Sequence, residues 1–346
     1  MMSMKKYLLL VLAVILFAAC SVSSKTGQLN TPADNIQYEE IAGSGFNNAP
    51  SICNKYIPIL GIEDGSKFSV RASVPEKGIV AINYHFESLM GSPQDISILE
   101  IDPSQFDFQV LDHKGLKRTS QAASELEAVA AMNGTFYDMK KGGSVCYLQI
   151  DGVVADTTKG KDMRVRANGA VVIKKGKLSI EPWSQDKEKV FRSKLQRKTS
   201  VMATMPLLIK DGYAVELIEY KGFSDKRHPR SVVFEKDGKI CLMVIDGRSK
   251  GNAAGMTLDE VQRYLLSIDG GKGCENAVNL DGGGSSTLWI SPVLSTSSSI
   301  SSPSSSSSGN FSPNVFFGVL NHPSDNGKFD NKGERRVSNS IIVIKK

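Results

Sequence analysis

The sequence lacks the motifs of several well-known cofactor and metal sites. It has no HExxH motif and no two cysteines close together, and its histidines are scattered at His85, His113, His228 and His322, which argues against zinc. No Gly-Lys-Ser or Gly-Lys-Thr completes a phosphate-binding loop, and no dinucleotide fingerprint is present. We therefore predict no cofactor and no metal site. A divalent cation near Asp281 is the alternative, although residue spacing gives no support for it.

Aromatic and basic residues do not form a nucleic-acid pattern. Trp183 and Trp289 are the only tryptophans, and no basic cluster with interleaved aromatic residues occurs. Removing Lys5 and Lys6 with a leader lowers the 42 basic residues to 40 against 36 acidic ones, a net charge of +4. This mild charge suits a small anionic substrate.

No hydrophobic run is long enough to span a membrane. The run from Tyr7 to Ala19 follows two lysines and is too short for a spanning helix, which indicates a secretory signal peptide over residues 1–19. Small residues directly before Cys20 resemble a bacterial lipobox, so Cys20 is the predicted lipidation site, and secretion without an anchor is the alternative. We expect a protein of the bacterial cell envelope that meets the membrane through this lipid anchor alone.

Cysteine is also scarce, with five in the chain. An oxidising compartment would allow one or two disulfides among Cys53, Cys146, Cys241 and Cys274. The spacing leaves all three ways of pairing these four cysteines open.

Alternating apolar and polar residues follow a polar tether predicted over residues 20–45. In the domain predicted for residues 46–346, a strand-rich part over residues 46–115 contains FSVRASV, GIVAINYHF, DISILEID and FDFQVLD. Asp-Gly or Lys-Gly pairs at 151–152, 175–176, 211–212 and 237–238 predict tight hairpins. A Ser-rich run over residues 294–312 predicts a disordered loop, either a plain surface loop or a lid.

Two segments predict helices. Residues 119–133 combine strong helix formers with a closing Asn-Gly, and residues 257–268 begin with a capping box of Thr257 and Glu260. The second helix has a buried face at Leu258, Val261, Leu265 and Ile268. Because tight hairpins join most strands, we predict an α+β fold of mixed or mostly antiparallel twisted sheets with a few packed helices.

Two aspartates stand directly after apolar runs. Asp246 follows ICLMVI and Asp281 follows AVNL, and buried strands often present a carboxylate at their C-terminal end. The three glycines after Asp281 would leave N–H groups unshielded by any Cβ, which suits phosphate or sugar oxygens. A simple turn is the alternative interpretation of either Asp-Gly pair.

A further polar segment over residues 227–231 places His228 and Arg230 just before the strand pattern SVVFE. A guanidinium group can hold a phosphate through two parallel hydrogen bonds. A solvated charged loop is the alternative interpretation of this segment.

Together these segments resemble the phosphodiester glycosidase family. The matching pieces are AMNGTFYD (131–138), RHPRS (227–231), VIDGRSKGNAAGMTLDEV (244–261), CENAVNLDGGGSST (274–287) and ERRVSNSIIV (334–343). They occur in family order between residues 78 and 344. Family members often carry NGG or NAG where this chain has Asn133-Gly134-Thr135, and the Ser-rich run is an insertion.

The resemblance implies hydrolysis of a sugar 1-phosphodiester at the glycosidic C–O bond, which releases an N-acetylglucosamine-like sugar and a phosphate monoester. It implies Asp281 as base or nucleophile, Asp246 as its partner or as a ligand of a sugar hydroxyl, and Arg230 as a catalytic phosphate ligand. The implied substrate-binding residues are Asn133, His228, Arg248, Asn279, Gly282, Gly283, Gly284 and Ser285. The alternative function is a surface lipoprotein that binds glycans without turnover. Neither function involves nucleic acid.

Overall fold

The computed structural model describes residues 36–42, 52, 54–63, 66–193, 198–293 and 317–346. The predicted signal peptide, Cys20 and the Ser-rich run lie outside the described residues. Of the predicted tether, the described part is β1 (Ile36–Ala42), which pairs in parallel with β2 (Phe68–Glu76).

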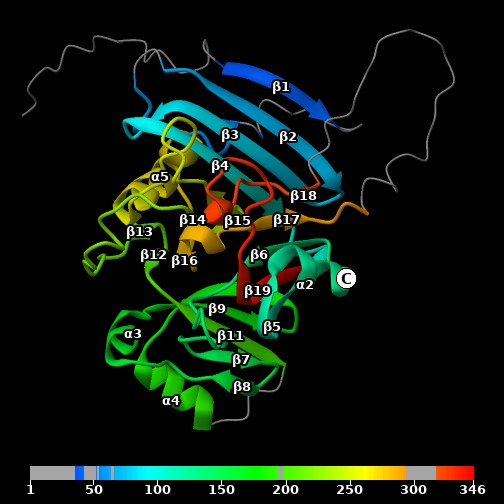
Figure 1. Ribbon diagram of the computed structural model, residues 1–346, viewed down its shortest axis with the longest axis vertical. Coiled ribbons are helices and arrows are strands. Elements are labelled where there is room, and N and C mark those ends of the chain that lie inside the picture. The colour runs from blue at the N-terminus through cyan, green and yellow to red at the C-terminus, as the bar shows by residue number, and fades with distance from the viewer. Residues whose placement is uncertain (1–35, 43–51, 53, 64–65, 194–197, 294–316) are drawn as a thin grey trace, which may run out of the picture. The chain divides into compact units, whose positions relative to one another are not determined.

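The remaining strands alternate with short helices along the chain (Figure 1). The strands are β3 (Ile79–Leu89), β4 (Ser92–Ile101), β5 (Phe106–Arg118), β6 (Ala130–Asn133), β7 (Leu148–Ile150), β8 (Val153–Asp156), β9 (Gly169–Lys174), β10 (Lys177–Pro182), β11 (Thr199–Thr204), β12 (Leu207–Lys210), β13 (Tyr213–Ala214), β14 (Arg230–Lys236), β15 (Lys239–Ile245), β16 (Asn276–Asn279), β17 (Leu288–Ile290), β18 (Gly318–Val319) and β19 (Arg336–Lys345). The helices are α2 (Thr119–Glu125), α3 (Lys161–Arg166), α4 (Gln185–Ser193) and α5 (Leu258–Gly271), with 3-10 turns η2 (Gly283–Ser285) and η3 (Ser324–Asn326).

The described strands form three sheets. The first has nine strands in the order β1-β2-β3-β4-β15-β14-β16-β12-β13, the second is β10-β9-β11-β7-β8, and the third is β18-β17-β6-β19-β5. Apart from the pair of β1 and β2, the paired strands are antiparallel. The predicted α+β class with mostly antiparallel sheets is confirmed.

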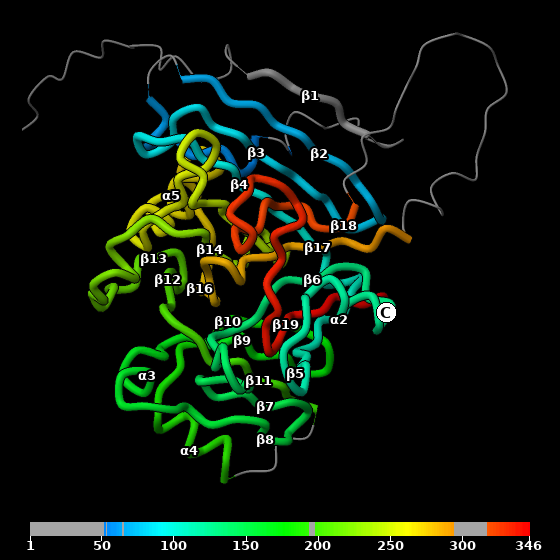
Figure 2. Tube along the Cα trace, in the orientation of Figure 1, coloured from blue at the N-terminus to red at the C-terminus, as the bar shows by residue number. Residues whose placement is uncertain are grey.

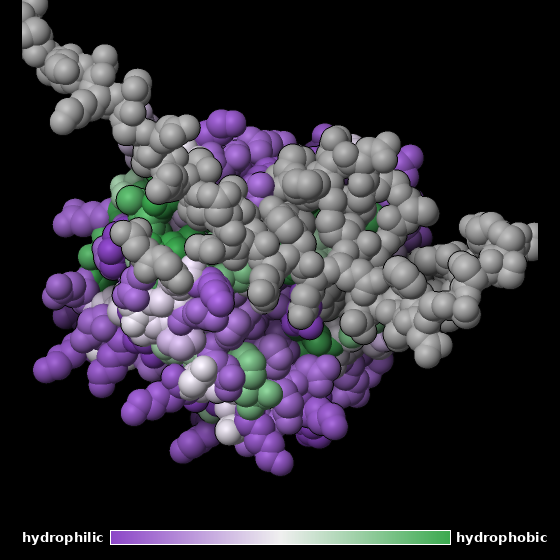
Figure 3. Space-filling model, turned by 90° about the horizontal axis from the view of Figure 1, so that it is seen from above, coloured by the Kyte–Doolittle hydropathy of each residue, from purple (hydrophilic) through white to green (hydrophobic). Residues whose placement is uncertain are grey.

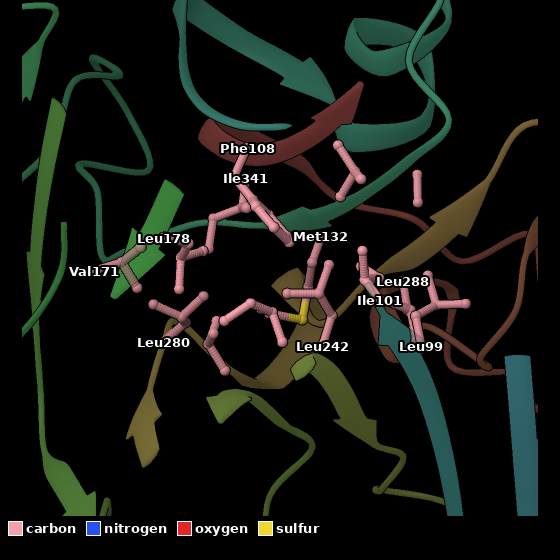
Figure 4. Close-up of a cluster of buried hydrophobic side chains, with 14 of the residues drawn as sticks. Leu99, Ile101, Phe108, Met132, Val171, Leu178, Leu242, Leu280, Leu288 and Ile341 are labelled. Carbon is pink, nitrogen blue, oxygen red and sulfur yellow. The ribbon is translucent and has the colours of Figure 1, made fainter. Parts of the chain in front are cut away.

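One hydrophobic core is shared by all three sheets. Figure 4 shows Leu242 of the first sheet, Val171 of the second and Met132 of the third among its buried side chains. The opposite face of the first sheet packs against α5, whose predicted apolar residues Leu258, Val261, Leu265 and Ile268 are all buried. Each sheet is therefore stabilised by apolar packing, and the loops at the strand ends are free to carry chemistry.

The predicted tight hairpins and the predicted capping box are confirmed. All four predicted hairpins form, and both residues of each turn have positive φ, as in Asp151 (47°) and Gly152 (89°). The Thr257 side chain accepts from Glu260 N, and the Glu260 side chain accepts from Thr257 N, so the predicted capping box is present.

The helix predicted for residues 119–133 is wrong beyond its first half. α2 ends at Glu125, and residues 130–133 form β6, which pairs with β17 and β19. The small residues Ala130 and Ala131 are fully buried between neighbouring strands. Tertiary packing thus overrides a high helix propensity, and the closing Asn133-Gly134 marks the end of a strand instead of a helix.

The described surface has the hydropathy of an ordinary globular protein. On the face shown in Figure 3, the described surface is mostly hydrophilic with small hydrophobic patches. Within the described residues, no helix combines the length and apolar character needed to cross a membrane.

Three of the cysteines are buried free thiols: Cys146, Cys241 and Cys274. No disulfide joins any two of these three residues, although the sequence allowed such pairs.

Candidate active site

The two aspartates that follow strands lie at the same edge of the first sheet. β15 and β16 pair with β14 on either side of it, so their C-terminal ends flank the start of β14. Asp246 and Asp281 therefore stand about 10 Å apart along the backbone edge, across one intervening strand. The end of β6 meets them there, because Asn133 Nδ2 donates to the Asp281 carbonyl oxygen over 2.7 Å. The Cα trace in Figure 2 shows β6 beside β17, the strand that follows the glycine turn.

Asp281 is partly buried just before the turn η2. Burial raises the pKa of the Asp281 carboxyl to about 6, although Ser285, Arg335, the Gly282 N–H group and Arg248 all favour its ionised form. A carboxyl group with this pKa is mostly ionised at neutral pH but can still take up a proton during a reaction.

The glycines after Asp281 allow two guanidinium groups to come close to the turn. Gly283 has a φ of +63°, and a Cβ there would lie 2.8 Å from Nη2 of Arg248. A Cβ on Gly284 would overlap the guanidinium group of Arg335. Arg335 is held by Asp325, whose Oδ1 accepts from its Nε over 2.7 Å. Two cations beside a half-buried turn form an arrangement that suits a phosphate group.

The N–H groups of the turn are less available than the sequence predicts. Gly283 N donates to the Pro229 carbonyl over 2.9 Å, and Ser285 N donates to the Gly282 carbonyl over 3.2 Å. The buried Ser285 hydroxyl favours the ionised Asp281, but it makes no hydrogen bond of good geometry with the described residues. The Ser285 hydroxyl and the two arginines are therefore the groups best prepared to accept a ligand here.

Tyr137 completes this side of the site. Its hydroxyl donates to the Arg336 carbonyl over 2.9 Å. Burial raises the pKa of Tyr137, Asp281 raises it further, and Ser285 and Arg335 oppose the shift, so these side chains share one electrostatic environment. Sequence reasoning gave Tyr137 and Arg335 no role, although both stand inside the motifs AMNGTFYD and ERRVSNSIIV.

Asp246 belongs to a second and more deeply buried group. The residue is 1% exposed, its Oδ1 accepts from Asn321 Nδ2 over 2.9 Å, and its Oδ2 accepts from His322 N over 2.8 Å. His322 Nδ1 lies 2.9 Å from the same Oδ2. Burial raises the pKa of Asp246 against the effect of these hydrogen bonds. For His322, burial lowers the pKa, but the hydrogen bond and negative charge of Asp246 outweigh it and leave the pKa above its ordinary value.

Asn321 connects this second group to the glycine turn. Its Nδ2 also donates to the Ser286 carbonyl over 3.1 Å, and its Oδ1 accepts from Leu288 N over 2.9 Å. Both oxygens of Asp246 are thus used to hold the loop that follows β18. Sequence reasoning missed Asn321 and His322 because their segment, NHPSDNGKF, has no strand or helix pattern that predicts its position.

Arg230 turns away from the glycine turn. Its Nε donates to the Met256 carbonyl over 2.8 Å, and its Nη2 donates to the carbonyls of Phe223 and Lys226 over 2.7 and 2.9 Å. The residue is 1% exposed, and burial lowers its pKa to about 10, so it remains charged at neutral pH. These bonds hold the loop before β14, and they give the guanidinium group a structural task in place of the predicted phosphate contact.

Three other predicted ligands are built into the scaffold. Asn133 is fully buried, and its Oδ1 accepts from Ser231 Oγ over 2.8 Å. Asn279 Nδ2 donates to the carbonyls of Met205 and Leu280 over 2.8 and 2.7 Å. His228 Nε2 lies 3.1 Å from the Gly222 carbonyl, and burial lowers the pKa of His228.

Of the described residues, one group has the geometry to hold a metal ion. It consists of Asp95, Asp246 and His322, and it does not include Asp281.

Comparison with known proteins gives a family match and several structures of similar fold. A family model described as phosphodiester glycosidase matches residues 126–344. The search of curated proteins returned no match.

Among the solved structures that share the fold, three have a TM-score of 0.52 each. The catalytic domain of zebrafish N-acetylglucosamine-1-phosphodiester alpha-N-acetylglucosaminidase, auto-inhibited by its pro-peptide, is 17% identical over 81% of this chain and 83% of its own. A hypothetical protein from Synechocystis is 14% identical over 80% of this chain and 64% of its own. A putative exported protein from Burkholderia pseudomallei K96243 is 12% identical over 83% of this chain and 99% of its own. At these identities the likeness concerns the fold alone.

Proposed function

The chain belongs to the phosphodiester glycosidase family, and on this basis we propose that it hydrolyses a sugar 1-phosphodiester at the glycosidic C–O bond. The products are a free sugar, of the N-acetylglucosamine type, and a phosphate monoester. The observation that carries the proposal is the Asp281 carboxyl beside a glycine turn that is approached by the guanidinium groups of Arg248 and Arg335.

The chemistry needs few protein groups. The leaving group is a phosphate monoester whose second pKa is about 6, so it departs without the strong general acid that an alcohol would require. Positioning and charge are therefore the main tasks of the site. Arg248 and Arg335 bind the phosphate, and the Ser285 hydroxyl is available to a substrate oxygen.

Asp281 acts at the anomeric carbon in this proposal. An ionised Asp281 either activates a water molecule or attacks the carbon directly, and both roles require the unprotonated carboxylate. Asp246 positions the C-terminal loop, because both of its oxygens already accept hydrogen bonds from Asn321 and His322.

A direct test is an assay in H₂¹⁸O with an N-acetylglucosamine 1-phosphodiester. We expect release of free sugar together with phosphate monoester, and we expect ¹⁸O at C1 of the sugar. Label in the phosphate would show P–O cleavage and contradict the proposal. Binding of the diester without any product would support the glycan-binding alternative.

The pH profile tests the role of Asp281. Because its pKa is about 6 and the reaction needs its ionised form, kcat/KM should fall about tenfold per pH unit below 6 and level off above it. The measurement is kcat/KM between pH 4 and 9 in buffers of constant ionic strength. A rate that instead declines as pH rises through 6 would make Asp281 a proton donor and refute its role as base or nucleophile.

A further inference from the structure

Asp95, Asp246 and His322 reach one buried point from three separate segments. Asp95 lies in β4, Asp246 directly follows β15, and His322 lies between β18 and η3. Their carboxylate and imidazole atoms all lie within 4.8 Å of one another. His322 Nδ1 is 2.9 Å from Asp246 Oδ2 and 3.9 Å from Asp95 Oδ1. Atoms bound to one ion at about 2.1 Å are at most about 4.2 Å apart, so a small shift would close the set around an ion.

Two buried carboxylates come together at this point. Asp95 is 4% exposed and Asp246 is 1% exposed, so water does little to stabilise either carboxylate. His85 Nδ1 lies 3.4 Å from Asp95 Oδ2, and Arg71 lines the adjoining cavity, so both of these basic side chains stand at the edge of the group. A divalent cation held between the two carboxylates would balance their charge and would also bind the imidazole nitrogen.

A second layer of amides orients both carboxylates. Asn83 Nδ2 donates to Asp95 Oδ1 over 2.6 Å, and Asn321 Nδ2 donates to Asp246 Oδ1 over 2.9 Å. Carboxylates that bind metal ions are commonly held by such outer hydrogen bonds, which leave the second oxygen or a remaining lone pair for the ion.

A cavity adjoins the group on the side of His322. It has a volume of about 410 Å³, and its lining includes Arg71, His322 and Phe329. The imidazole ring of His322 stacks on Phe329 with 3.9 Å between ring centres, which fixes the ring at the cavity wall. This space can hold the water molecules that would complete the coordination of an ion with three protein ligands.

We propose that Asp95, Asp246 and His322 bind a divalent transition-metal ion, Zn²⁺ or Mn²⁺, with water ligands facing this cavity. Two carboxylates and one imidazole suit these ions better than Mg²⁺ or Ca²⁺, which prefer oxygen ligands. Because Asn321 ties Asp246 to the Ser286 carbonyl, the ion would hold the loop of Asp325 and Arg335 against the glycine turn. This proposal replaces the sequence-based expectation of no metal site.

The test measures metal content and needs no substrate. Purified full-length protein is stripped with EDTA, incubated with Zn²⁺ or Mn²⁺, desalted and analysed by mass spectrometry of the elements. We expect about one ion per chain and a higher Tm in the loaded protein. Affinity should fall at least about 100-fold in His322→Gln and in Asp95→Asn, and it should be unchanged in His113→Gln, a histidine outside the group.

Two results would overturn the proposal. One is a folded wild-type protein that takes up neither ion and whose His322 ring NMR signals do not move when the ions are added, which would leave a hydrogen-bonded imidazole network instead. The other is equal metal uptake by wild type and by a His322→Gln, Asp95→Asn double variant that circular dichroism shows to be folded.

Discussion

Replacing Asp281 by Asn should reduce kcat at least about 10³-fold towards a sugar 1-phosphodiester without destabilising the protein. The amide keeps the size of the side chain but can neither accept a proton nor attack the anomeric carbon. Turnover assays measure the loss of kcat, and thermal unfolding of the same samples measures the stability.

The expected stability of Asp281→Asn follows from the direction of the pKa shift of Asp281. The carboxyl of Asp281 has a pKa of about 6 in the folded protein, above the value of about 4 in an unfolded chain. The folded state therefore binds this proton more tightly, and the contribution of Asp281 to the free energy of unfolding falls as pH rises from about 4 to about 6 and stays lower above that. The side-chain amide of Asp281→Asn cannot ionise, so at pH 7.5 the Tm of this variant should equal or exceed that of the wild type.

Asp138→Asn is the matched control for this substitution. Asp138 lies next to Tyr137, and its Oδ1 accepts from Lys140 N over 2.8 Å in an exposed turn, so its loss should leave turnover intact. If Asp281→Asn keeps more than a tenth of wild-type kcat, Asp281 is neither base nor nucleophile.

The two arginines named by the sequence should separate into a functional and a structural residue. Arg248→Ala should lower kcat/KM about 100-fold with little change in Tm, because Arg248 is exposed, lies against Gly283 and makes no hydrogen bond to a described residue. Arg230→Ala should instead destabilise the protein by about 3 kcal/mol or more, since it leaves three buried carbonyl contacts unmade.

Lysine variants sharpen this comparison. Arg248→Lys keeps the positive charge and should recover part of the activity, whereas Arg230→Lys cannot reproduce three hydrogen bonds from a planar group and should stay unstable. Steady-state kinetics and chemical denaturation of all four variants provide the measurements. A stable Arg230→Ala protein with 100-fold lower kcat/KM would show that Arg230 binds the substrate, and it would contradict the structural role.

Local patterns predicted most of the architecture. Asp-Gly hairpins and the capping box at Thr257 depend on residues a few positions apart, so the sequence alone was sufficient. The helix predicted for residues 119–133 is wrong over its second half. The alanines of this segment favour a helix in isolation, but its end forms β6, which is buried between β17 and β19. A neighbour so distant in sequence leaves no local signature.

The site was only partly predictable for the same reason. Asp281, the glycines and Arg248 follow strand patterns and could be placed at a sheet edge. Tyr137 and Arg335 reach the glycine turn from opposite parts of the chain, and Asn321 lies in a loop whose path depends on Asp246. The guanidinium group of Arg230 is suited to phosphate binding, but its orientation is set by backbone carbonyls of a loop that no sequence pattern predicts.

The position of β19 has a consequence for how the protein matures. It follows every other described strand in the sequence, yet it lies between β6 and β5 inside the third sheet instead of at its border. Arg335 immediately precedes it. The chain can therefore complete neither this sheet nor the surroundings of Asp281 until residues 335–345 have joined the fold. Before that step, β5 and β6 each expose the edge that β19 covers in the native sheet.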